Sequence, residues 1–128
     1  GKISDTYGRV PVLIGSTAVL VVAMIILSLS HSVTMMLVGA VLYGLSWGIN
    51  SPVLTAWTVD LCEPVNRGKA ISSMYIALEV GIGTGALFSG WIYHNESSQF
   101  IYAFLTPAIL ALIACALLIR WNNKRALA

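Results

Sequence analysis

The chain has 128 residues, of which 58% are hydrophobic and only 9% are charged, with a net charge of +2. Soluble domains carry about 25% charged residues, so this composition excludes a soluble enzyme, a nucleic-acid-binding module and a disordered segment. The mean hydropathy of +0.86 agrees. We therefore expect a protein whose solvent is largely the lipid bilayer, with no nucleic-acid partner.

Four long apolar runs predict an all-α, polytopic membrane protein with four transmembrane helices. Each run is long enough to cross a hydrocarbon core about 30 Å thick at 1.5 Å per residue. The only charged residue inside any of them is Glu79. In chain order, the predicted segments are a loop at 1–10, helices at 11–30 and 33–59, a loop at 60–69, helices at 70–93 and 99–119, and a tail at 120–128.

The basic residues predict the orientation of these helices. All of them fall before the first helix, between the second and third, or after the fourth, and the other two connectors contain no Lys or Arg. Because positively charged loops stay on the cytoplasmic side, we expect both termini and the 60–69 loop to be cytoplasmic. The residues are Lys2, Arg9, Arg67, Lys69, Arg120, Lys124 and Arg125.

Two stripes of side chains run along the predicted helix at 33–59. Small residues recur every three to four positions and would let another helix approach closely; they are Ala40, Gly44, Gly48, Ser51 and Thr55. Beside them lie Tyr43, Trp47, Asn50, Leu54 and Trp57. This second stripe is consistent either with packing or with the wall of a polar cavity, for which Tyr43, Trp47 and Asn50 are the candidates. Pro52 is expected to kink the helix or free a carbonyl.

The helix at 70–93 carries Glu79 on a face of polar and small residues that also holds Tyr75, a further cavity candidate. Glycines follow at positions 81, 83 and 85, where they favour tight helix contact or local bending. A carboxyl near the bilayer centre is neutralised, hydrated or paired, and no basic residue lies at that depth. Three roles are open for Glu79: proton coupling, a fixed interhelical hydrogen bond or contact with a substrate.

The start of the chain carries the pattern G-x-x-x-D-x-x-G-R in Gly1, Asp5, Gly8 and Arg9. This resembles the cytoplasmic loop motif of the major facilitator superfamily, although Val10 stands where that family often has a second basic residue. The segment from Asp60 to Ala70 resembles the loop that enters the eleventh helix of drug and sugar efflux permeases. The glycine run after Glu79 is similar to theirs. The resemblance implies family helices nine to twelve.

The resemblance also implies a function. It implies a secondary transporter that moves a small molecule by alternating access, with proton-coupled efflux as the leading hypothesis and Glu79 as the coupling or substrate residue. The partner would be the missing N-terminal half of the same transporter, in a bacterial inner membrane. The ninth and twelfth helices of that fold are peripheral. We also expect a cytoplasmic charge network in which Arg9 and Asp60 lie close together, joined by Glu63 or Arg67.

Two alternatives are a complete four-helix protein that works as an oligomer, like small multidrug exporters with one membrane glutamate, and a structural membrane subunit. An enzyme is not expected, because no Ser/His or His/Asp pair shares a helix face. Neither a metal nor another cofactor is expected, since the chain has no cluster of metal-ligating residues. We expect Cys62 and Cys115 to be free thiols.

Overall fold

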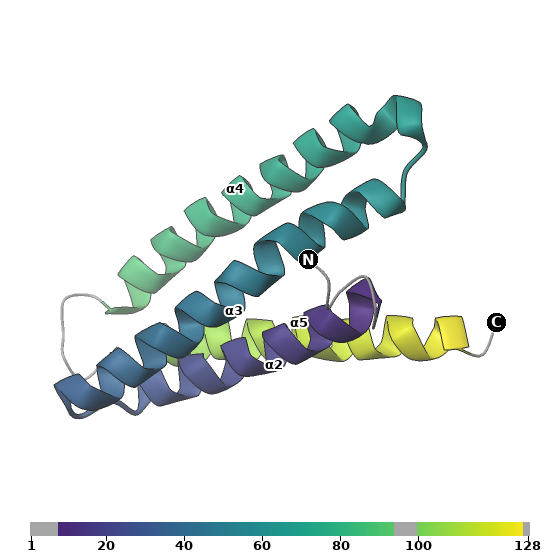
Figure 1. Cartoon of the computed structure of the whole chain (residues 1–128). Coiled ribbons are helices and arrows are strands. Elements are labelled where there is room, and N and C mark those ends of the chain that lie inside the picture. Colours follow the sequence, from purple (N-terminus) through teal and green to yellow (C-terminus); the bar gives the residue numbers. More distant parts are fainter. Residues whose placement is uncertain (1–7, 94–99, 127–128) are drawn as a thin grey trace.

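The computed structural model describes residues 8–93 and 100–126, with side chains for 8–93 and 101–123. Four long helices, α2 (Arg9–Ser28), α3 (Val33–Asp60), α4 (Arg67–Tyr93) and α5 (Phe100–Ala126), follow one another, with the short 3-10 turn η1 (Pro64–Asn66) before α4 (Figure 1). Each long helix is long and apolar enough to cross a membrane. The expected all-α fold with four membrane-spanning helices is therefore confirmed.

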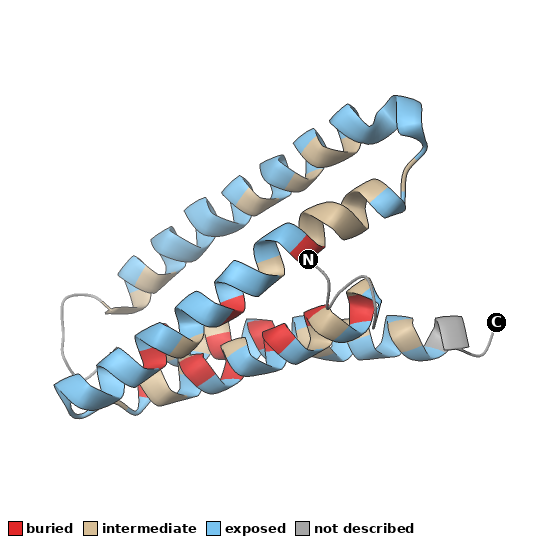
Figure 2. Cartoon of the chain, in the orientation of Figure 1, coloured by how far each residue is buried: buried red, intermediate tan, exposed pale blue. Residues whose placement is uncertain are grey.

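Helix α2 lies at the centre of the described helices. It packs along α3 on one side and α5 on another, whereas α4 has much less contact with its neighbours. Figure 2 shows this as buried positions on α2, α3 and α5 and none on α4. Seven residues of α2 are buried: Val10, Leu13, Ser16, Thr17, Val21, Ala23 and Ser28.

The peripheral position expected for the first helix in the whole transporter stays a prediction, and within the described helices α2 packs closely on two sides. The physical reason is the small residues within its aliphatic run, which let neighbouring backbones approach closely. Ala23 is fully buried, and Ser16 and Ser28 are 5% and 2% exposed. Helix α5 also packs with small side chains, since Ala103, Ala108 and Ala111 are buried.

Several helix ends differ from the predicted bounds. Helix α2 runs from Arg9, inside the predicted loop, to Ser28, and α4 begins at Arg67 instead of residue 70. Helix α5 continues to Ala126 instead of giving way to a tail after residue 119. The segment from Arg120 to Ala126 contains neither Gly nor Pro, so nothing in it stops a helix that has already formed. The end of the apolar run therefore does not mark the end of the helix.

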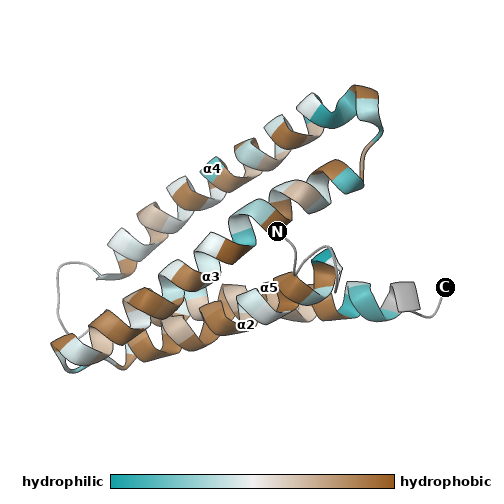
Figure 3. Ribbon diagram, in the orientation of Figure 1, coloured by the Kyte–Doolittle hydropathy of each residue, from teal (hydrophilic) through white to brown (hydrophobic). Residues whose placement is uncertain are grey.

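Hydrophilic residues gather at one end of the helices, at the start of α4 and towards the end of α5 (Figure 3). We call this the basic end and define it by Arg9, Arg67 and Arg120. The start of α2 and the end of α3 also lie there, because Arg9 contacts Asp60. The positive-inside rule predicts that this end faces the cytoplasm.

The connector between α2 and α3 is four residues long, Leu29 to Ser32. It closes with a hydrogen bond from the Leu29 N–H to the Ile25 carbonyl at 3.0 Å. The hydroxyl of Ser32 accepts a hydrogen bond from the Met35 N–H, which caps the start of α3. Helices α2 and α3 are therefore an antiparallel hairpin. The most apolar stretches of the chain lie in α2 and α5, and those of α3 and α4 are less apolar.

Candidate functional site

The entry into α2 depends on Gly8. Its φ of +89° places it in a region that side-chain-bearing residues rarely adopt, and it directly precedes Arg9, the first residue of the helix. The backbone conformation of Gly8, the second glycine of the loop motif, thus sets the direction in which α2 begins and from which the Arg9 side chain extends. The other motif residues, Gly1 and Asp5, lie outside the described residues.

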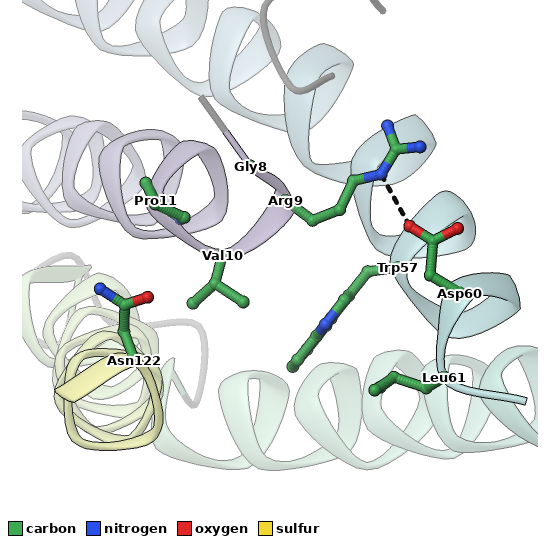
Figure 4. Close-up of a pocket in the computed structure, with 8 residues that line it drawn as sticks. All are labelled: Gly8, Arg9, Val10, Pro11, Trp57, Asp60, Leu61 and Asn122. Carbon is green, nitrogen blue, oxygen red and sulfur yellow. Dashed lines mark hydrogen bonds and ion pairs between the residues drawn. The ribbon is translucent and has the colours of Figure 1, made fainter. Parts of the chain in front are cut away.

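Arg9 and Asp60 form an ion pair, with 3.0 Å between Arg9 Nε and Asp60 Oδ2. Figure 4 shows the Arg9 side chain reaching from the start of α2 to the last residue of α3. The expected closeness of these two residues is confirmed. The side chains are 26% and 51% exposed, so solvent screens the pair. Among the described residues, neither Glu63 nor Arg67 joins it by an ion pair, and the wider charge network stays a prediction.

A pocket of about 400 Å³ lies next to this ion pair. Its lining is shown in Figure 4 and consists of Gly8, Arg9, Val10, Pro11, Trp57, Asp60, Leu61 and Asn122. The Trp57 ring also meets Trp121 of α5 edge to face, with 6.4 Å between ring centroids and 82° between the ring planes. This is a favourable aromatic geometry. The basic ends of α2, α3 and α5 therefore meet around one pocket.

A second hollow, of about 570 Å³, lies between α3 and α4. Tyr75 of α4 lines it opposite Ser51, Pro52 and Thr55 of α3, and the Arg9–Asp60 pair borders it. One side-chain hydrogen bond also joins these two helices, from the Thr58 hydroxyl to the Met74 sulfur at 3.2 Å. The expected cavity residue Tyr75 thus lies in an open groove that leads towards the basic end.

The aromatic stripe of α3 is divided between two environments. Tyr43 and Trp47 are 39% and 43% exposed, so they remain available to a cavity. Asn50 turns towards α2 and accepts a hydrogen bond from the Ser16 hydroxyl, while Trp57 contacts α5. For Asn50 and Trp57 the geometry favours packing, the first of the two interpretations that the sequence left open.

Glu79 lies near the middle of α4 with an exposed side chain. The cavity candidates Tyr75, Asn50 and Trp47 each carry a group that can donate a hydrogen bond, and none of these three described side chains donates one to Glu79. Asn50 is instead engaged with Ser46 of its own helix and Ser16 of α2. Any partner of the Glu79 carboxyl among protein groups therefore has to come from outside the described residues.

Sequence reasoning missed the residues that hold α2 against α3. Ser16 and Ser46 are buried polar residues, and Gly39 is the glycine of closest approach, where an added Cβ would stand 2.7 Å from Leu27 Cγ. The predicted small-residue stripe is open instead, since a Cβ at Gly44 or Gly48 meets nothing within 4 Å. The available signal was Ser16 and Thr17, two adjacent polar residues inside an aliphatic run.

Comparison with known proteins agrees with this picture of apolar helices and a motif-bearing loop. The sequence profile of the Major Facilitator Superfamily matches residues 1–127. The chain belongs to this superfamily. An uncharacterized MFS-type transporter of Mycobacterium tuberculosis is 28% identical over 116 residues, which are 91% of this chain and 17% of that protein. No solved structure was found to match.

Two other members of the superfamily carry more specific names. A proton myo-inositol cotransporter of Caenorhabditis elegans is 27% identical over 118 residues, 88% of this chain and 19% of that protein. A 3-(3-hydroxy-phenyl)propionate transporter of Escherichia coli is 29% identical over 126 residues, 98% of this chain and 30% of that protein. The chain thus spans less than a third of the length of the curated relatives it matches.

Proposed function

We propose that this chain is the helix-nine-to-twelve portion of a secondary active transporter in a bacterial plasma membrane. The transporter exports a small solute by alternating access, driven by protons. The observation that carries the proposal is the single carboxyl of Glu79 at mid-membrane depth in a member of a transporter superfamily. One relative is itself named a proton cotransporter.

Glu79 has the properties of a proton carrier. Translocon-based scales put a charged residue at the bilayer centre at a cost of about 2.5–3.5 kcal/mol. The nearest basic residue along α4 is Lys69, ten positions away or about 15 Å, which is too far for an ion pair. In the proposed cycle this carboxyl, which no ion pair along α4 engages, carries the coupled proton across the membrane.

The solute would lie between this portion and the N-terminal half of the transporter, because binding sites of such transporters lie at the midplane between two repeats. Tyr43, Trp47 and Tyr75 are exposed and would form this portion's share of the wall. The Arg9–Asp60 pair, with Glu63 and Arg67 nearby, would hold one conformation of the transport cycle at the cytoplasmic end.

The test is Glu79→Gln in the complete transporter, reconstituted in liposomes. Glutamine keeps the shape and hydrogen-bonding capacity but cannot titrate. We expect proton-driven transport to be lost while counterflow exchange of solute is retained. Thr84→Val is the matched control on the same helix, since the Thr84 hydroxyl bonds only to backbone carbonyls of α4. Unchanged proton-driven transport in Glu79→Gln would assign Glu79 a structural role.

A further inference from the structure

Three polar side chains lie between α2 and α3, well inside the membrane-spanning stretch. Ser46 is 1% exposed and Ser16 is 5% exposed, and Asn50 is half-buried beside them. Ser16 lies seven residues after the start of α2, about 10 Å from the basic end. At that depth water does not compensate a polar group, so each group depends on a protein partner.

In the hydrogen bonds among these three residues, each side chain donates to the next. The Asn50 amide donates to the Ser46 hydroxyl at 3.4 Å, and that hydroxyl donates to the Ser16 backbone carbonyl at 2.7 Å. The Ser16 hydroxyl lies 2.5 Å from the Asn50 side-chain oxygen, and it also lies 2.9 Å and 3.2 Å from the Val12 and Leu13 carbonyls of its own helix. We assign its single proton to the shortest of these contacts, the one to Asn50. Each side chain therefore donates once within the cluster, and two of the three bonds cross from one helix to the other.

The cluster differs from the hydroxyl contacts that stay within a single helix. Thr55 and Ser73 donate to carbonyls four residues earlier in their own helices, which leaves the position of the helix unaffected. The shortest bonds of the Ser16 and Ser46 hydroxyls instead join α2 to α3. They also leave no buried side-chain nitrogen or oxygen unpaired among the described residues. Separating α2 from α3 would break both cross-helix bonds with no water to replace them.

We propose that Ser16, Ser46 and Asn50 are an interhelical clamp that makes α2 and α3 one rigid body. Asn50 is then a positioning residue and not a solute ligand. This inference does not depend on the transport activity proposed above. It predicts that relative movement between α2 and α3 stays small as long as the clamp is intact, and that movement appears when one of its members is removed.

The test measures the distance between α2 and α3 directly, in the 128-residue chain reconstituted in lipid nanodiscs. The native thiols are replaced in Cys62→Ala and Cys115→Ala, and spin labels are attached at Val22→Cys and Val41→Cys, two exposed positions on α2 and α3. Pulsed electron spin resonance gives the distance distribution. In this parent we expect a single narrow peak.

Asn50→Leu removes the amide and keeps a similar volume. We expect a second, longer-distance population to appear in the distribution. The ratio of separated to closed molecules should rise about 3- to 20-fold for each cross-helix hydrogen bond lost, according to the measured strength of such bonds in membranes. Ser46→Ala, a smaller change, is expected to act in the same direction and carries the test if Asn50→Leu does not fold. Thr55→Val, on the same helix, is the matched control and should leave the distribution unchanged.

Two results would overturn the clamp. One is a broad or two-peaked distribution in the parent, which would show that α2 and α3 already separate with the hydrogen bonds available. The other is a distribution in Ser46→Ala, and in Asn50→Leu where it folds, that coincides with the parent. Packing alone would then hold the two helices together.

Discussion

At the residue scale, α2 and α3 approach each other closely at a glycine, which has no side chain. Gly39 is buried near the start of α3, and Leu27 of α2 fills the space that its side chain would take. A Cβ at Gly39 would lie 2.7 Å from Leu27 Cγ and 2.8 Å from Leu27 Cδ2, which is shorter than real carbon contacts. Gly39 thus sets the spacing of the hairpin at the end opposite the basic end.

Gly39→Ala is expected to destabilise the protein. The added methyl group overpacks the contact with Leu27, at a cost of about 1–3 kcal/mol, which exceeds the roughly 0.5–1 kcal/mol that Ala gains over Gly in a helix. Thermal unfolding in detergent micelles, followed by circular dichroism, would show a lower midpoint for this variant.

Gly44→Ala is the matched control, because a Cβ at Gly44 meets nothing within 4 Å. Its unfolding midpoint should stay the same or rise slightly. In a Leu27→Ala background the effect of Gly39→Ala should shrink, since the overlapping atoms are gone. An equal change for both glycines would mean that backbone propensity and not the contact with Leu27 decides the outcome.

At the element scale, the ion pair of Arg9 and Asp60 joins the first residue of α2 to the last residue of α3. Because the connector joins the opposite ends of these helices, the hairpin is fixed at both ends. With side chains 26% and 51% exposed, the pair acts as a partly screened surface contact that aligns the ends and adds little to stability.

A double-mutant cycle with Arg9→Ala and Asp60→Ala is expected to give a coupling energy of about 0.2–1 kcal/mol, the range measured for exposed pairs. The coupling should fall in 1 M salt, where the screening length is only about 3 Å. Unfolding midpoints of the four proteins in micelles at low and high salt provide the measurement.

The control cycle pairs Asp60→Ala with Arg67→Ala, since Arg67 makes no ion pair with Asp60 in the described part of the chain. Its coupling energy should be near zero. A coupling between Arg9 and Asp60 that does not change with salt would contradict the solvent-screened pair and indicate a more enclosed environment.

At the scale of the whole molecule, the described helices leave much of α4 and one side of α3 uncovered. Among the described residues, α4 has none that is buried, and a Cβ at Gly44 or Gly48 of α3 would meet nothing within 4 Å. We expect residues 1–128 alone, reconstituted in liposomes, to show no saturable uptake, because the proposed solute site needs walls from both halves.

The uptake measurement would use radiolabelled myo-inositol and 3-(3-hydroxyphenyl)propionate, the solutes in the names of two relatives. The control is liposomes that contain the Glu79→Gln variant of the same chain. Uptake that saturates and is lost in that variant would favour the alternative of a four-helix protein working as an oligomer.

Much of this architecture could be predicted from the sequence, because the length of each apolar span and the charge of each loop can be read from a short stretch of residues. The four membrane spans follow from the length of each apolar run and the helix rise. The closeness of Arg9 and Asp60 follows from the two-residue gap between the predicted helices at 11–30 and 33–59, which makes these helices antiparallel neighbours. The central position of α2 could not be predicted in this way. It depends on which face of each helix meets which neighbour. The sequence alone does not distinguish a glycine that contacts another helix, such as Gly39, from one that contacts none of the described helices, such as Gly44.

The difference in apolarity between the helices has a consequence for how the chain enters the membrane. Helix α2 is strongly apolar and precedes the less apolar α3, so α2 can leave the translocon first and provide a surface for α3. The second pair has the reverse order, since α4, with Glu79, precedes the strongly apolar α5. Helix α4 therefore depends on a neighbour during synthesis, either the hairpin already inserted or α5 when it emerges.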